Sequence, residues 1–174
     1  MGMKKPDEAE AIINNCISEF GPKTSKGVEI KPTLKQRLFP LYPKDYYKEM
    51  YATAAFINKK QDKYRTAATH MEKALANATK KTERIRYTYI LGQLYLSIDS
   101  IKQANKYFTT ILGMNAPFEF EFNASINVAR AYDPKDKAAV KKVRRSLKRM
   151  LKDEKNDGMY DQIHFELAQL EYKQ

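Results

Sequence analysis

The chain has 174 residues with a formal net charge of +11, and 43% of its residues are hydrophobic while 30% are charged. With six glycines and seven prolines, this composition is typical of a folded, helix-prone chain rather than a disordered one. No stretch approaches the roughly 18 consecutive apolar residues of a membrane span, and the single cysteine excludes an intrachain disulfide and a cysteine-rich zinc site.

The first predicted helix covers residues 7–20, with Asp7 in its first turn and Gly21 after its end. Acidic residues interrupt this segment before any apolar run develops, so we expect no signal peptide in it. Cys16 lies on this helix and is expected to be buried on its apolar face, since a free cysteine packs as a small hydrophobe.

The segment from residue 21 to residue 43 holds six of the thirteen glycines and prolines. It is therefore predicted to be an irregular connector, with at most a short helix near residues 34–38. We place a boundary after residue 43, which separates the N-terminal helix and connector (1–43) from a helical array (44–174).

Within the array, helical periodicity predicts seven helices. Their starts are marked by Asp62, Asp99 and Asp133 with the following Pro134, and Gly113 marks one end. Strand-like alternation occurs only in FEFEF, residues 118–122, which is too short to form a sheet. The predicted helices cover residues 44–60, 63–78, 82–97, 100–113, 117–132, 136–153 and 159–173. The fold class is therefore all-α.

Residues 90–117 contain small and aromatic residues at the intervals of a tetratricopeptide repeat. The matching residues are Leu91, Gly92, Tyr95, Ala104 and Phe108. Gly92 and Ala104 are expected where the two helices of a pair cross, because only small side chains allow so close an approach. Tyr95 and Phe108 are then expected to fill the space between neighbouring pairs.

The same frame recurs at a spacing of 37 residues. Upstream, the matching positions are Tyr64, Ala67, Met71 and Ala74. Downstream, Ala129 and Tyr132 take the places of Gly92 and Tyr95, and Val143, Leu147 and Met150 follow on the next helix. The chain is therefore predicted to be a tetratricopeptide-type α-α superhelix of about three helix pairs plus a final single helix.

Three segments resemble a narrower family: RYTYILGQLY, ANKYFTTILGMNAPFEFEFNASINVARAYD and LKRMLKDEKNDGMYDQIHFELAQL. They are similar to the bacterial tetratricopeptide lipoproteins of the type IX secretion and gliding-motility system, the PorW/SprE group, over roughly residues 45–174. The resemblance implies a protein at the periplasmic face of the outer membrane, held there by a lipid on a cysteine outside these residues. It also implies a role in connecting parts of the secretion machinery.

Catalytic and metal-binding patterns are missing from the sequence. His70 and His164 lie on different predicted helices, and neither has a second histidine or a cysteine at metal-ligand spacing. Both are expected to be ordinary packed or surface residues. No phosphate-binding loop, nucleophile elbow or paired-carboxylate pattern is found. We therefore expect neither enzymatic activity nor a metal or cofactor.

The basic charge is concentrated in residues 141–152, which contain seven basic residues and no acidic one. These are Lys141, Lys142, Arg144, Arg145, Lys148, Arg149 and Lys152. Around a helix they fan out opposite an apolar stripe. They form either a solvated outer face or a surface that binds an acidic protein, a nucleic acid or an anionic lipid. No aromatic residue lies among them to stack on a base, which disfavours nucleic acid.

Tetratricopeptide arrays line a concave face with the first helix of each pair, and this face is the predicted binding groove. Its candidates are Phe56, Lys59, Arg86, Tyr89, Gln93, Asn123, Asn127, Arg130, Phe165 and Gln169. Asparagine and arginine side chains bind peptide backbones and carboxylates, although polar residues also occupy any solvated face.

The sequence thus predicts a protein-binding scaffold, an accessory part of a type IX secretion or gliding-motility apparatus. Its expected partners are other proteins, and peripheral association with a membrane stays open. The alternatives are a general peptide-binding regulatory domain and a binder of anionic surfaces through residues 141–152.

Overall fold

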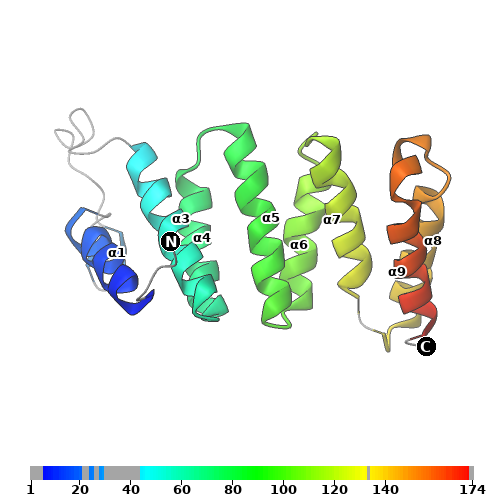
Figure 1. The fold of residues 1–174 in the computed structure, drawn as a ribbon, viewed down its shortest axis with the longest axis horizontal. Helices are drawn as coiled ribbons and strands as arrows, with labels where there is room; N and C mark the ends of the chain where they lie inside the picture. The colour runs from blue at the N-terminus through cyan, green and yellow to red at the C-terminus, as the bar shows by residue number, and fades with distance from the viewer. Residues whose placement is uncertain (1–5, 21–23, 26–27, 30–43, 133, 173–174) are drawn as a thin grey trace. The chain divides into compact units, whose positions relative to one another are not determined.

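The computed structural model describes residues 6–20, 24–25, 28–29, 44–132 and 134–172. The described chain is all-α, as predicted, and its helices pack in adjacent pairs (Figure 1). Its one extended element is a pair of two-residue antiparallel strands, β1 (Thr24–Ser25) and β2 (Val28–Glu29). The chain divides into two compact units, Met1–Tyr87 and Thr88–Gln174, and the division falls inside helix α5.

Eight α-helices lie in the described residues. They are α1 (Pro6–Phe20), α3 (Lys44–Lys60), α4 (Tyr64–Asn77), α5 (Lys81–Ser97), α6 (Ile101–Leu112), α7 (Phe118–Arg130), α8 (Lys137–Met150) and α9 (Tyr160–Tyr172). All eight were predicted, and FEFEF forms the first turns of α7. The largest difference is at the end of α8: the sequence predicts a helix up to residue 153, but α8 ends at Met150. The chain there turns into a short 3₁₀ helix, η1 (Glu154–Met159). The predicted short helix near residues 34–38 and the boundary after residue 43 fall outside the described residues.

In the first unit, α3 packs against α4, and α1 packs against α3. The face of α4 turned inward carries Ala67 and Ala74, both fully buried, and Met71. Two polar contacts join α1 to the turn after α3: Gln61 donates to Asp7 at 3.4 Å, and Lys63 donates to Glu10 at 2.7 Å. Cys16 is half-buried rather than fully buried as predicted. Among the described residues, α1 packs mainly against one helix, α3, so part of its surface stays uncovered.

Asp62 and Asp99 do not begin helices, contrary to the prediction. Both adopt left-handed backbone angles, with φ of 58° and 55°, and each follows the end of a helix. The N–H of Lys63 donates to the carbonyl of Asn58 at 2.9 Å, and Asp62 N–H donates to the carbonyl three residues before it at 3.1 Å. The turn at Asp99 has the same two bonds. These pairs of bonds form a Schellman motif, in which aspartate is one of the few side chains that tolerate the left-handed region.

The residue that caps α8 is Asp136. Its carboxylate accepts hydrogen bonds from the backbone N–H groups of Ala138 and Ala139 at 2.9 and 3.1 Å. Two of the donors that the first turn of a helix leaves unpaired are thereby satisfied. Asp133, which the sequence suggested as the start signal, lies outside the described residues.

The second unit is built around the contact between Gly92 on α5 and Phe108 on α6. A Cβ atom placed on Gly92 would lie 2.6 Å from ring atoms Cε1 and Cζ of Phe108. The ring is fully buried and also packs edge-on against Tyr89, with ring centroids 5.7 Å apart. The small residue therefore makes room for an aromatic ring of its own helix pair. The sequence had assigned that ring to the space between pairs.

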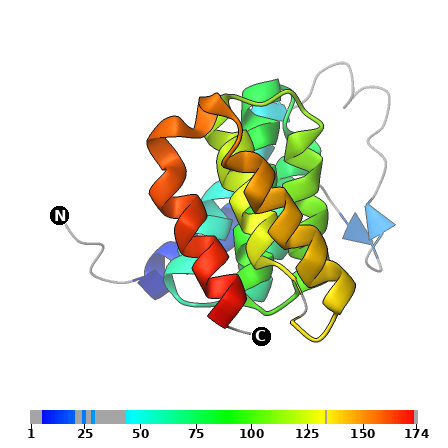
Figure 2. The same ribbon diagram turned by 90° about the vertical axis from the view of Figure 1, so that its right-hand side faces the viewer.

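Helix α7 contributes to two neighbouring clusters of buried side chains. Ala124 packs with Ala104, Phe108 and Ile111, whereas the opposite side of α7 packs with α8 and α9. The second cluster contains Phe122, Ile126, Ala129, Val140, Val143, Leu147, Ile163 and Leu170. Seen from the side, α8 and α9 lie next to each other (Figure 2).

The other positions of the repeat frame differ in burial. Leu91 is fully buried, but Tyr95, Tyr132 and Met150 are only partly buried. The ring of Tyr95 stacks on that of Tyr107, with centroids 5.5 Å apart.

Candidate functional site

Polar side chains of α5 and α7 meet in the second unit, where the sequence predicted a groove. Asn127 is 7% exposed, and its amide donates to the hydroxyl of Tyr89 at 3.3 Å and to the carbonyl of Asn123 at 2.7 Å. The amide of Asn123 in turn donates to the carbonyl of Glu119 at 2.7 Å. Asn127 therefore connects α7 to α5 and does not project freely into solvent.

An ion pair makes the corresponding connection between α7 and α9. The guanidinium of Arg130 donates from Nε to a carboxylate oxygen of Glu166 at 2.8 Å. The Glu166 side chain is 7% exposed, whereas that of Arg130 is 45% exposed. The hydrogen bond to Glu166 raises the pKa of Arg130, so the guanidinium stays charged. Arg130 therefore neutralises a buried carboxylate while part of its side chain faces solvent.

Glu166 is a residue that sequence reasoning missed. It lies 36 residues after Arg130, and Tyr89 lies 38 residues before Asn127. One contact joins α5 to α7 and the other joins α7 to α9, and in each the two residues are about one repeat length apart. A search for complementary polar residues about one repeat apart would have found them.

The exposed candidates of this surface in the second unit are few. Phe165 on α9 is 57% exposed, and Gln93 and Gln169 are half-buried. Tyr89 and Asn123 are half-buried as well. Together with the outer part of Arg130, these are the predicted groove residues of the second unit that remain accessible to a partner.

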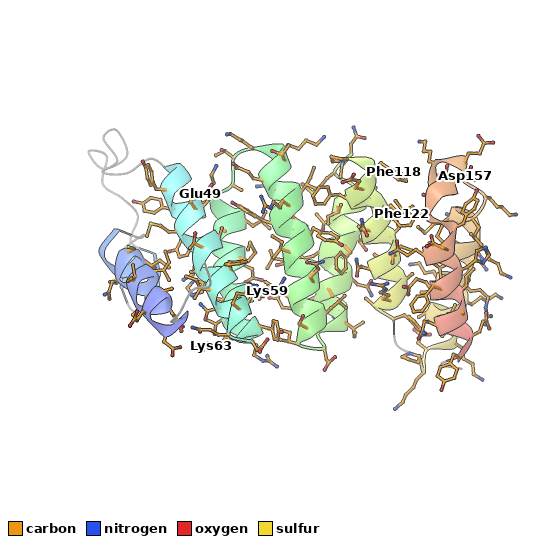
Figure 3. The ribbon with its side chains drawn as sticks, viewed as in Figure 1. Glu49, Lys59, Lys63, Phe118, Phe122 and Asp157 are labelled. Atoms are coloured by element: carbon orange, nitrogen blue, oxygen red, sulfur yellow. The ribbon has the colours of Figure 1, made fainter. Side chains whose placement is uncertain are left out.

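The first unit holds the remaining groove candidates, Phe56, Lys59 and Arg86, and all three are exposed. The ammonium of Lys60 lies 5.5 Å from the centre of the Phe56 ring, within the range of a cation–π contact. Lys59 lies in the last turn of α3 (Figure 3).

A partly buried ion pair lies in the first unit. The ammonium of Lys48 lies 2.7 Å from a carboxylate oxygen of Glu83, and the Lys48 side chain is 4% exposed. The hydrogen bond from Lys48 lowers the pKa of Glu83. The pair joins α3 to α5 and has no access for a ligand at the lysine.

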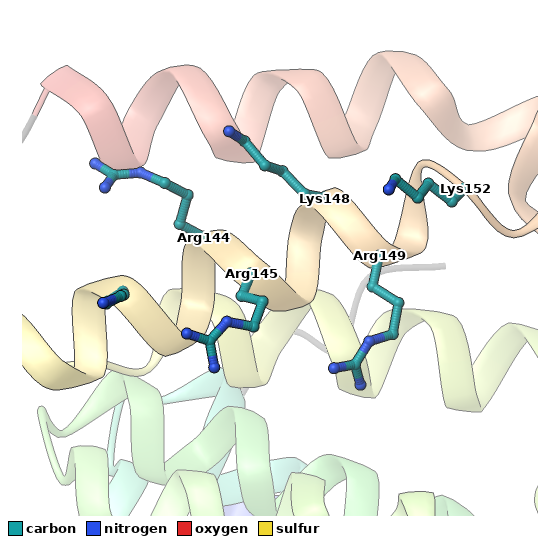
Figure 4. Close-up of a pocket in the computed structure, with 6 residues that line it drawn as sticks. Arg144, Arg145, Lys148, Arg149 and Lys152 are labelled. Atoms are coloured by element: carbon teal, nitrogen blue, oxygen red, sulfur yellow. The ribbon is translucent and has the colours of Figure 1, made fainter.

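The seven basic residues predicted as a patch lie on α8 and the turn after it, and we call them the basic face. Six of them line a hollow of about 510 Å³ (Figure 4). They are Lys141, Arg144, Arg145, Lys148, Arg149 and Lys152. The apolar stripe of the same helix, formed by Val140, Val143 and Leu147, is buried.

One arginine of the basic face already binds a carboxylate. Arg144 donates from two nitrogens to the two oxygens of Glu171 on α9, at 2.7 and 2.8 Å. The hydrogen bond from Arg144, with the nearby charge of Lys148, lowers the pKa of Glu171. Arg145 and Arg149 extend to the other side of α8 (Figure 4) and form no ion pair within the described parts of the chain.

The two histidines lie in different surroundings. His70 stacks on Tyr51, with ring centroids 6.2 Å apart, and its Nδ1 is buried without a hydrogen-bond partner in the described structure. Burial, followed by the positive charge of Lys73, lowers the pKa of His70. His164 is exposed. Over residues 6–20, 24–25, 28–29, 44–132 and 134–172, no cluster of three or more histidine, cysteine or acidic residues is arranged to hold a metal ion.

None of the helices in the described part of the chain combines the length and apolar character needed to span a membrane. Comparison of the chain with protein-family models and with curated protein sequences gave no match.

Proposed function

We propose that the protein is a non-catalytic scaffold of the tetratricopeptide type that binds other proteins. The observation that carries this proposal is the contact between Gly92 on α5 and Phe108 on α6, where a Cβ atom on the glycine would lie 2.6 Å from the ring. The turns at Asp62 and Asp99 support it, because they repeat the same backbone geometry at the 37-residue spacing of the sequence frame. Repeated helix pairs of this kind build extended binding surfaces.

The binding surface in this proposal is the exposed side of α5, α7 and α9. Phe165 is its aromatic anchor, and Arg130 supplies a charged donor whose partner Glu166 holds it in position. A few aromatic and arginine side chains typically provide most of the binding free energy at a protein interface. Gln93 and Gln169 then supply hydrogen bonds to a peptide backbone.

We further propose that the scaffold serves a type IX secretion or gliding-motility apparatus, at the periplasmic face of the outer membrane. The support for this step is the resemblance of residues 45–174 to tetratricopeptide lipoproteins of that system. A general peptide-binding regulatory domain is the alternative if the partner lies outside secretion.

The test is cross-linking in cells that produce the protein, with identification of the captured proteins by mass spectrometry. Phe165→Ala is expected to abolish capture of a secretion component, because it removes the exposed anchor. Tyr172→Ala is the matched control: it removes another aromatic from α9, 88% exposed, and should leave capture unchanged. A captured partner without a role in secretion would favour the general peptide-binding domain. Equal capture by the Phe165 variant and the natural protein would refute the proposed surface.

A further inference from the structure

We propose that the basic face of α8 binds an acidic polypeptide segment of a partner protein, whose carboxylates enter the hollow along the helix. This inference rests on the proposed scaffold function and assigns it a second surface and a partner chemistry. It concerns α8 and the turn after it, whereas the groove candidates of the second unit lie on α5, α7 and α9.

The first argument is the density of positive charge. Six basic side chains line one hollow of about 510 Å³, and residues 141–152 contain no acidic residue. At a rise of about 1.5 Å per residue, Lys141 and Arg149 on α8 are separated by roughly 12 Å along the helix. That length matches about four residues of an extended chain, so several carboxylates of one short segment fit along the face.

The second argument is the ligand that the face already holds. Arg144 grips Glu171 with two parallel hydrogen bonds, the geometry in which arginine binds carboxylates most specifically. Arg145 and Arg149 are one helical turn apart and extend to the same side (Figure 4). Among the described residues, no acidic side chain pairs with either. They offer the same fork to a carboxylate from another chain.

The surroundings of the face favour a polypeptide over the other anionic partners. No aromatic residue occurs between residues 141 and 152 to stack on a base. The branched apolar residues of α8 are buried, with Val140, Val143 and Leu147 at most 8% exposed. The described helix therefore has no apolar side free to enter a bilayer, as membrane-surface helices do.

The test measures binding of a fluorescein-labelled peptide of about twelve glutamates by fluorescence anisotropy at low salt. Arg145→Glu with Arg149→Glu should weaken binding about tenfold or more, because two attractive contacts become repulsive. The matched control is Lys102→Glu with Lys106→Glu on α6, also exposed, four residues apart and equal in charge change. It should weaken binding no more than about threefold. Circular dichroism verifies that each variant stays folded.

A second variant tests the carboxylate chemistry in the opposite direction. Glu171→Gln removes the carboxylate that Arg144 binds and with it a negative charge beside the face. It should tighten binding of the glutamate peptide about two- to fivefold. Glu119→Gln on α7 changes the net charge equally and should leave the affinity within about twofold of the natural protein.

Three results would overturn the inference: no binding of the glutamate peptide, equal losses in the α6 and α8 charge reversals, or tighter binding of duplex DNA or of phosphatidylglycerol vesicles than of the peptide. Failure here is distinguishable from failure of the proposed function, because capture through Phe165 does not use α8. Loss of peptide binding with intact Phe165-dependent capture refutes only the basic-face inference.

Discussion

Replacing Gly92 by alanine tests the packing at the centre of the second unit. The added Cβ would lie 2.6 Å from two ring atoms of Phe108, about 1 Å closer than the optimal separation of carbon atoms. The ring is fully buried, so relief requires movement of a packed core. Overpacking of this kind costs about 1–3 kcal/mol, and the higher helix propensity of alanine offsets about 1 kcal/mol of it. We expect Gly92→Ala to lower the free energy of unfolding by up to about 2 kcal/mol.

The measurement is urea unfolding followed by far-UV circular dichroism, with the slope checked for equality among variants. Gly158→Ala is the control: a Cβ there meets no atom within 4 Å, and the change should stay below about 0.5 kcal/mol. In a Phe108→Leu background, which lacks the outer ring atoms, Gly92→Ala should become stabilising by about 0.5–1 kcal/mol. If Gly92→Ala destabilises equally in both backgrounds, the close contact with the ring is not the reason for the glycine.

Three further predictions concern charges and caps. Arg130→Met should destabilise the protein by about 2 kcal/mol, because it leaves the buried carboxylate of Glu166 without its partner. Glu166→Gln leaves no such charge and should cost about 1 kcal/mol or less. Equal losses of the two variants in thermal unfolding would contradict this. The lowered pKa of His70 means that the unfolded chain binds the proton more readily, so stability should fall as pH drops below 6.5, and His70→Gln should flatten that fall in unfolding titrations. Asp136→Ala should cost about 1 kcal/mol through loss of the α8 cap, whereas Asp136→Asn should cost only a few tenths.

The helices could be predicted because their signals are local. Apolar residues at helical spacing indicate where each helix lies. Gly92 indicated a close contact with the neighbouring helix, because glycine otherwise weakens a helix. The turns were harder, because aspartate before a helix is common both as an N-cap and as a left-handed residue. Asp62 and Asp99 belong to the second class, and only backbone angles distinguish them.

The polar contacts of the candidate site were beyond a reading of single helices. Asn127 and Arg130 were assigned to a groove because of their place on a helix, but their partners lie more than 35 residues away in the sequence. Whether such a side chain faces solvent or a neighbouring helix depends on how the helices pack. The basic face was predictable because its charge lies in one continuous segment, and what the structure adds is the carboxylate on Arg144.

The tight turn at Asp62 also limits how the chain can change in length. Residues 61–63 join α3 to α4, and the N–H groups of Asp62 and Lys63 donate the two Schellman bonds back to carbonyls of α3, so an extra residue here would break the turn. One inserted residue would rotate α4 by about 100° about its axis, which would carry Ala67 and Ala74 away from α3. Insertions are therefore better tolerated in the longer link between α8 and α9, and that link is the place to lengthen or label the protein without disturbing its helix pairs.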